Sequence, residues 1–267
     1  MTLPRIGVFD SGVGGLTVLR SMAGQMPAHY LYFGDTARLP YGTKSAETVA
    51  RYAIGATRFL EAQGIDLLVV ACNTATALAL PQIKQAASVP VIGVVEPGAI
   101  MAAEVSRSRA VIVIATEATI SSHAYRDALR QHGMEAYEKA CPLFVPLVEE
   151  GWIDHPVTEQ VARIYLDEAM AESSDTADVL VLACTHYPLL TPLLRRITPE
   201  RIRIVDSAES TARVVKTMLA ASNEGASVTD HRTFRFCVTD STDKFKRLAT
   251  RFLGRQVDHV GHVDLGG

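Results

Sequence analysis

The 267-residue chain has few of the features that mark secreted, membrane-bound or disulfide-rich proteins. Its four cysteines include no Cys-x-x-Cys pair, which argues against a disulfide framework and against a zinc site. Its longest apolar runs, such as DLLVVA and AVIVIA, are far shorter than the roughly 20 residues of a membrane-spanning helix. The start, MTLPRIGVFDSG, lacks the pattern of a secretory signal peptide. We therefore expect a cytoplasmic protein with free thiols.

An excess of one charge is also missing. The chain has 26 basic and 29 acidic residues, a net charge of -3, and these residues are spread evenly along it. Without a basic patch there is no reason to expect nucleic acid or a membrane surface as a partner. Hydrophobic residues make up 48% of the chain, which is enough for one large domain or two small ones with buried cores.

The order of apolar and amphipathic segments predicts the fold class. Short apolar runs such as RIGVFD, HYLYFGD and DLLVVAC show no polar alternation, and each is followed by a stretch with helical spacing. Parallel strands that are covered by helices on both faces have this pattern. We therefore predict an α/β protein with mainly parallel sheets.

The same pattern starts again in the second half of the chain. The segment DLLVVACNTA from Asp66 aligns with DVLVLACTHY from Asp178, so that aspartate, apolar strand and cysteine match position by position. We predict two similar, pseudo-symmetric α/β domains, residues 1–97 plus 207–267 and residues 98–206, with the active site in the cleft between them. Within the tail, TFRFCVTDS and RQVDHVGHV are predicted as added strands and ASNEGASVTD as a polar loop.

Cys72 and Cys184 are the strongest candidates for chemistry. Each follows an apolar strand, at the end where open parallel sheets place their ligands, and each is followed by small polar residues. A strand end that leads into a helix N-terminus can lower the pKa of a thiol, so we expect reactive thiolates here. A single buried cysteine is usually a packing residue, and we interpret Cys141 and Cys237 in that way. The matched pair favours function.

Two thiols on opposite faces of a substrate suit one type of reaction. Inverting a tetrahedral carbon requires removal of a proton from one face and delivery of a proton to the other. A thiolate and a thiol can exchange these roles, so one pair serves both directions.

Other segments offer polar groups near the predicted strand ends. FDSGVGG presents Asp10 and Ser11 before three glycines whose amides could bind a carboxylate, although a structural turn is an equal alternative. The spacing does not fit a nucleotide-binding glycine loop. Tyr41 and Gly42 suit a fixed loop beside a small ligand. His186 could act beside Cys184, with Glu149 orienting it, although each residue alone is more often structural or solvated.

The chain resembles the glutamate racemases of bacterial cell-wall synthesis. The motifs FDSGVGG, YFGDTARLPYG, ACNTA, CPLFVPLVEEG, ACTHYPLL and DSA occur in that family's order and cover nearly the whole chain. The resemblance implies an isomerase that needs no cofactor and supplies D-glutamate for peptidoglycan. One departure is Ala183, where the family usually has glycine before the second cysteine.

The resemblance also implies roles for individual residues. Cys72 and Cys184 are implied as the acid/base pair, assisted by Asp10 on one side and by Glu149 and His186 on the other. The implied substrate-binding residues are Asp10, Ser11, Tyr41, Gly42, Asn73, Thr74, Thr119, Thr185 and His186. Family members often form homodimers, so a homodimer is a further expectation.

Three alternatives remain open from the sequence. The same chemistry could act on aspartate or another small amino acid. Racemisation with pyridoxal phosphate would need a lysine for the Schiff base, but none of the six lysines lies beside these motifs. A non-catalytic small-molecule binding protein would not need both cysteines.

Overall fold

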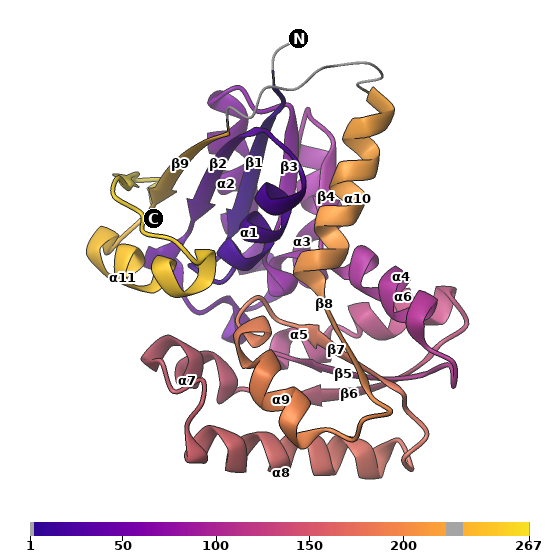
Figure 1. Ribbon diagram of the computed structural model, residues 1–267. Helices are drawn as coiled ribbons and strands as arrows, with labels where there is room; N and C mark the ends of the chain where they lie inside the picture. The colour runs from indigo at the N-terminus through magenta and orange to yellow at the C-terminus, as the bar shows by residue number, and fades with distance from the viewer. Residues whose placement is uncertain (1–2, 223–231, 267) are drawn as a thin grey trace.

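The computed structural model describes residues 3–222 and 232–266 and contains two parallel sheets (Figure 1). The first sheet has the strand order β10-β9-β2-β1-β3-β4, and the second has the order β6-β5-β7-β8. The strands of the first sheet are β1 (Arg5–Asp10), β2 (His29–Gly34), β3 (Leu67–Val70), β4 (Val91–Gly93), β9 (Thr233–Val238) and β10 (Gly261–His262). Those of the second are β5 (Ala110–Ala115), β6 (Glu135–Ala140), β7 (Val179–Ala183) and β8 (Arg203–Asp206). The α/β class with parallel sheets is confirmed.

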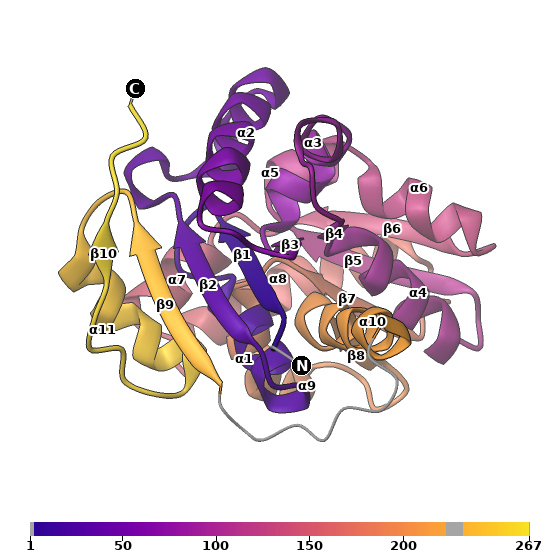
Figure 2. The same cartoon turned by 90° about the horizontal axis from the view of Figure 1, so that it is seen from above.

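Helices cover both faces of each sheet (Figures 1 and 2). The α-helices are α1 (Leu16–Gln25), α2 (Ala46–Ala62), α3 (Asn73–Ala86), α4 (Val95–Val105), α5 (Glu117–Ser121), α6 (Ala124–Gln131), α7 (Phe144–Glu150), α8 (Pro156–Glu172), α9 (Thr191–Ile197), α10 (Ser207–Ser222) and α11 (Thr242–Leu253). Short 3-10 helices are η1 (Thr36–Arg38), η2 (Tyr41–Thr43) and η3 (Tyr187–Leu190). We call the first sheet with its helices the first lobe, and the second sheet with its helices the second lobe.

Burial on both faces explains why the strands show no polar alternation. In β3, Leu67 and Val69 belong to one core cluster and Leu68 and Val70 to another on the opposite face. The cluster that contains Leu67 continues into the second lobe, where it includes Ile112 of β5. The two lobes therefore share a hydrophobic core in addition to having their own.

The central strand orders of the two lobes are the same, β2-β1-β3-β4 and β6-β5-β7-β8. The matched aspartates also act alike, because each fixes the start of the neighbouring strand. Asp66 accepts a hydrogen bond from the backbone N–H of Arg5, and Asp178 accepts hydrogen bonds from those of Arg107 and Ser108. The repeated unit inferred from the sequence thus has a physical counterpart at the start of strands β3 and β7.

Some details of the tail differ from the sequence prediction. Only residues 261–262 of RQVDHVGHV form a strand, and the chain between the two predicted strands forms helix α11. The polar loop predicted for ASNEGASVTD lies, from residue 223 onward, outside the described residues. The predicted domain boundary after residue 97 falls inside α4, and the one after residue 206 falls between β8 and α10. Across the described ranges, no helix is both long enough and apolar enough to span a membrane.

Candidate active site

A cavity of about 440 Å³ lies between the two lobes and is lined by both Cys72 and Cys184. Cys72 directly follows the loop after β3, and Cys184 directly follows β7, so the two thiols come from equivalent strands. The two residues are only 5% and 6% exposed, and each belongs to a hydrophobic core cluster. Two buried thiols from opposite lobes therefore line the same cavity.

Most of the residues predicted for the site line this cavity. They are Ser11, Tyr41, Gly42, Cys72, Asn73, Thr74, Glu149, Cys184, Thr185 and His186. Asp10 and Thr119 are each 1% exposed and lie behind this lining. Thr119 bonds through its hydroxyl to those of Thr74 and Thr116, so it contacts the lining residues instead of the cavity.

Cys72 caps the helix that follows it. The backbone N–H of Ala75, in the first turn of α3, donates to the Cys72 sulfur at 3.4 Å, and the thiol donates to the Ser11 hydroxyl at 3.5 Å. The expectation of a lowered pKa at Cys72 is nevertheless wrong. Burial and the negative charge of Asp10 raise the pKa of Cys72 to about 12, and the capping hydrogen bonds offset only part of this. Cys72 is therefore a thiol at neutral pH.

Asp10 lies near Cys72 and is held there by hydrogen bonds within the first lobe. Its Oδ2 accepts hydrogen bonds from the Gly12 N–H at 3.0 Å and the Tyr32 hydroxyl at 3.2 Å. Its Oδ1 is buried and has no partner among the described residues. A buried carboxylate oxygen without a partner is costly in a protein interior, so Asp10 retains the capacity to accept one more hydrogen bond.

The surroundings of Cys184 carry the opposite charge. Cys184 is followed by a turn and the 3-10 helix η3, whereas Cys72 leads directly into an α-helix. His186 Nε2 lies 3.3 Å from Glu149 Oε1. Burial alone would lower the pKa of His186, but its interactions with Cys184 and Glu149 outweigh burial and raise that pKa to about 10. The resulting imidazolium places a positive charge beside Cys184.

Glu149 is the anionic partner of His186. Its hydrogen bond to His186, followed by the positive charges of His186 and Lys244, lowers the pKa of Glu149 below its usual range. Lys244 of α11 lies 3.4 Å from Glu149 Oε2 and lines the cavity. Lys244 was not predicted, because a lysine on an amphipathic helix carries no sequence signal that separates it from a solvated one.

The glycine turn before α1 works differently from the anion-binding loop considered from the sequence. The glycines at 12, 14 and 15 do not belong to the cavity lining among the described residues. A Cβ at Gly14 would lie 2.2 Å from Thr185 Oγ1 and 2.5 Å from His186 Nδ1, and one at Gly15 would lie 2.7 Å from Asp10 Cβ. These glycines therefore leave space for site residues, and Gly14 lets the first lobe contact the loop that carries Cys184.

Two networks fix the remaining polar groups. Tyr41 donates to buried Asp35 at 2.6 Å, which anchors the loop that contributes Tyr41 and Gly42. Asn73 accepts a hydrogen bond from the Tyr125 hydroxyl at 2.7 Å and donates to the Ser207 hydroxyl at 3.2 Å. Because Tyr125 belongs to the second lobe, Asn73 both lines the cavity and links the lobes.

The cavity lining includes further residues that the sequence analysis missed. These are Leu39, Pro40, Thr43, Thr116, Glu117, Pro142, Val145, Pro146 and Lys244. Thr116 forms a ring of hydroxyl hydrogen bonds with Thr74 and Thr119, with oxygen separations of 3.0–3.2 Å. Its position after β5, equivalent to that of Ser11 after β1, was a signal that could have identified it.

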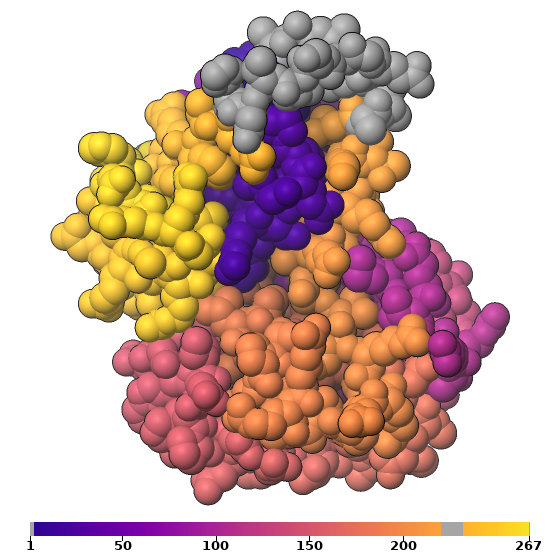
Figure 3. Space-filling view, viewed as in Figure 1, coloured from indigo at the N-terminus to yellow at the C-terminus, as the bar shows by residue number. Residues whose placement is uncertain are grey.

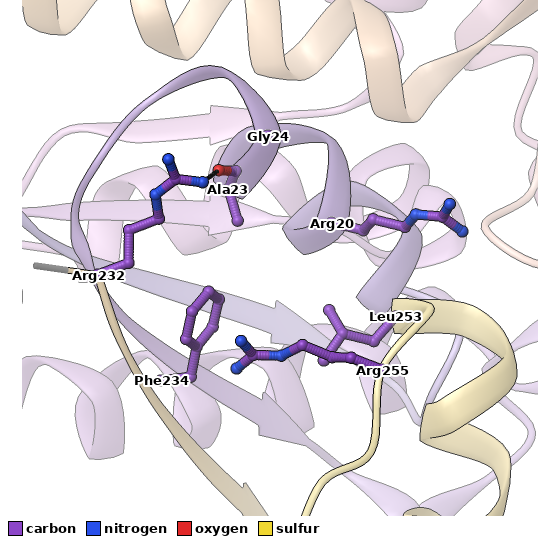
Figure 4. Close-up of a pocket in the computed structure, with 7 residues that line it drawn as sticks. All are labelled: Arg20, Ala23, Gly24, Arg232, Phe234, Leu253 and Arg255. Atoms are coloured by element: carbon purple, nitrogen blue, oxygen red, sulfur yellow. Dashed lines mark hydrogen bonds between the residues drawn. The ribbon is translucent and has the colours of Figure 1, made fainter. Parts of the chain in front are cut away.

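A second cavity, of about 390 Å³, lies in the first lobe beside α1 and the end of α11 (Figure 4). Three arginines border it, but their guanidinium groups do not converge. Arg232 donates to the Ala23 carbonyl, Arg255 lies 3.8 Å over the Phe234 ring, and Arg20 points away from both. This cavity has no thiol in its lining and does not offer the paired acid and base that the reaction needs.

Neither cavity has the ligand set of a metal centre. Within residues 3–222 and 232–266, no group of three or more His, Cys, Asp and Glu side chains is arranged to hold a metal ion. The polar groups around the two thiols are mainly hydroxyls, with the amide of Asn73 and the carboxylates of Asp10, Glu117 and Glu149, and these suit the ammonium and carboxylate groups of a small zwitterion.

Comparisons with known proteins place the chain in a family. Residues 6–215 match the family described as Asp/Glu/Hydantoin racemase. A glutamate racemase of Koribacter versatilis is 59% identical, with 99% of this chain and 98% of that protein covered. The crystal structure of glutamate racemase from Thermus thermophilus in complex with beta-chloro-D-alanine has 43% identity and a TM-score of 0.87, covering 98% and 97% of the chains. The glutamate racemase of Francisella tularensis in complex with D-glutamate has 33% identity and a TM-score of 0.89, covering 99% of both chains.

Proposed function

This chain belongs to the Asp/Glu/hydantoin racemase family, and we propose that it interconverts L- and D-glutamate with Cys72 and Cys184 as the paired acid and base. The observation that carries this proposal is the single cavity that both thiols line from opposite lobes. Glutamate as substrate follows from the named relatives, which include a protein in complex with D-glutamate.

The reaction is a proton transfer across one carbon. One sulfur, as thiolate, removes the α-proton, so that the C–H bond breaks, an S–H bond forms and the electron pair remains on the α-carbon and its carboxylate. The thiol on the other face then gives its proton to that carbon, and its own S–H pair stays on sulfur. The two sulfurs have exchanged protonation states, and the reverse reaction starts from that arrangement.

The site residues divide into two sets around the α-carbon. Asp10 assists Cys72, and His186 with Glu149 assists Cys184. Ammonium and carboxylate groups of the substrate are held by Asp10, Ser11, Tyr41, Gly42, Asn73, Thr74, Thr119, Thr185 and His186, with Thr119 acting through Thr74. Burial of the two thiol residues strengthens these interactions because charges interact more strongly away from bulk water.

Isotope incorporation tests the two-base reaction. L- and D-glutamate are each incubated in deuterated water with wild type, Cys72→Ser, Cys184→Ser and the control Cys237→Ser, which alters a buried thiol outside the cavity. We expect deuterium at the α-carbon with wild type and the control. The two site variants should fail most severely on opposite enantiomers. Equal and nearly unchanged activity in Cys72→Ser and Cys184→Ser would contradict the two-base mechanism. If the protein racemised aspartate but not glutamate, the proposed substrate would be wrong.

The wider biological context forms part of the same proposal. The product serves bacterial cell-wall synthesis as D-glutamate for peptidoglycan, and the protein works in the cytoplasm as a homodimer. Analytical ultracentrifugation measures the assembly directly, and a single sedimenting species with the mass of one chain would contradict the homodimer.

A further inference from the structure

Helix α11 belongs to the first lobe in sequence and sheet order, yet it contacts the Cys184 side of the site. In Figures 1 and 3 it lies directly above α7 of the second lobe. Lys244 lies 3.4 Å from the Glu149 carboxylate, and Arg251 donates to the carbonyls of Val148 and Glu149 at 3.0 and 3.2 Å. Three groups at the end of α7 are thus held by cations from one helix.

The same helix also touches the histidine. The ring of Phe252 packs edge-on against that of His186, with centroids 5.0 Å apart. Glu149 therefore has one carboxylate oxygen on His186 and the other on Lys244, and its side chain is only 20% exposed. The two oxygens of this carboxylate are therefore held by two different partners, His186 and Lys244.

We propose that Lys244 is a positioning residue for the reaction, because its ion pair with Glu149 holds that carboxylate against Nε2 of His186. This inference rests on the proposed function, in which His186 assists Cys184. Lys244 acts through Glu149 and need not touch the substrate. Without Lys244, the Glu149 side chain has solvent beside it and can rotate away from the histidine.

The direction in which the pKa of His186 changes when Lys244 is removed distinguishes a positioning role from a simple charge effect. His186 interacts with Cys184 on its own loop and with Glu149 on α7, and the α11 cations Lys244 and Arg251 contact Glu149. If Lys244 acted only as a charge at fixed geometry, its removal would relieve repulsion and raise the pKa of His186. If it holds Glu149 in place, its removal lowers that pKa, because Glu149 is one of the groups that raise it.

A titration followed by NMR measures this sign directly. The imidazole signal of His186, assigned by its absence in His186→Gln, is followed against pH in the full chain without substrate. We expect the midpoint to fall by about 1 unit in Lys244→Met and Lys244→Gln and to stay near the wild-type value in Lys244→Arg. Lys246→Met is the matched control, since Lys246 lies on the same helix and pairs only with exposed Asp243 among the described groups. An unchanged or raised midpoint in both neutral variants overturns the proposal.

Steady-state kinetics provide a second, independent test of the role of Lys244. We expect kcat to fall about tenfold in Lys244→Met with KM changed less than about twofold, the pattern of a lost transition-state interaction. In a Glu149→Gln background, Lys244→Met should cause no further loss. A further tenfold loss in that background would show that Lys244 does not act through Glu149. The titration does not require turnover. It therefore tests whether Lys244 positions Glu149 even if the protein proves inactive on glutamate.

Discussion

The two thiols have the same place in the duplicated fold but opposite electrostatic surroundings. Cys72 lies above the Asp10 carboxylate, which together with burial raises the pKa of Cys72 to about 12. Cys184 lies beside His186, whose pKa is raised to about 10. The free protein at neutral pH therefore has a thiol on the first lobe and an imidazolium beside the sulfur of the second. A racemase needs this arrangement, since two thiolates or two thiols could not supply one acid and one base.

Selective alkylation tests the asymmetry. At pH 8 a thiol with a pKa of about 12 has a thiolate fraction of about 10⁻⁴, so we expect iodoacetamide to modify Cys184 at least about tenfold faster than Cys72. As pH rises below that pKa, the rate at Cys72 should increase about tenfold per pH unit, because its thiolate fraction does so. Peptide mass spectrometry of the substrate-free protein measures both rates. Faster modification of Cys72 would contradict the assignment.

The same alkylation assay measures how much Asp10 contributes to the raised pKa of Cys72. Removing its negative charge lowers the pKa of Cys72, so Asp10→Asn should speed alkylation of Cys72 about tenfold at fixed pH. Asp66→Asn is a suitable control, because Asp66 is an aspartate at the opposite end of the same strand–cysteine unit. An equal increase in both variants would point to general loosening of the lobe.

At the scale of elements, the turn between β1 and α1 is a contact between lobes. Thr17 of α1 donates its hydroxyl to the Thr185 carbonyl at 3.1 Å, and Gly14 leaves no room for a side chain against His186. The position of His186 therefore depends on a turn of the other lobe as well as on Glu149.

Replacing Gly14 by alanine should displace His186 while leaving the fold intact. The new methyl would lie within 2.7 Å of the imidazole ring, and a displacement on the order of 1 Å can reduce turnover by about 100-fold. We expect a loss of that order in kcat/KM in the alanine variant. Gly24→Ala is the matched control, because Gly24 lies in α1 and, apart from its chain neighbours and its own helix backbone, no atom of the described residues lies within 4 Å of its Cβ position. It should raise the free energy of unfolding by about 0.5–1 kcal/mol without changing activity. Activity near wild type in Gly14→Ala would show that the imidazole tolerates the shift.

The sequence predicted the strands that are buried on both faces and missed strand β6 and helix α11. Strands β1, β3, β5 and β7 are continuous apolar runs, which makes their type clear. Strand β6, EAYEKA, lies at a sheet edge and is only partly buried, so its pattern is not that of a core strand. Helix α11 did carry a signal, because Phe245, Leu248, Phe252 and their neighbours recur at helical spacing, and that signal was not used.

The site residues that a local sequence motif identifies could be predicted. The contacts that depend on tertiary packing could not. The alignment of Cys72 with Cys184 required only the repeat. The raised pKa of Cys72 required knowledge that Asp10 lies beneath it, and the contact between Lys244 and Glu149 joins residues 95 positions apart. Neither fact has a sequence signature, since a carboxylate at a strand end and a lysine on a surface helix each have many possible neighbours.

For the whole molecule, the decisive feature is that one chain supplies both thiols. The shared core cluster, the Asn73–Tyr125 hydrogen bond and the contacts of α11 hold the lobes on either side of one cavity. A homodimer of this chain would then contain two complete sites, and subunit contacts would not be needed to assemble either of them.

Mixing inactive variants tests this organisation. Cys72→Ser and Cys184→Ser proteins are unfolded together, refolded as a mixture and assayed for racemisation, with wild type taken through the same steps as the control. Because each chain contributes both sulfurs to its own cavity, no pairing of variant chains restores a complete site, and we expect no recovery above the separate variants. If the lobes of different subunits formed the site, half of the mixed dimers' sites would be intact, and about a quarter of wild-type activity would return. Recovery of that size would mean that the cavity between the lobes of one chain is not where the reaction occurs.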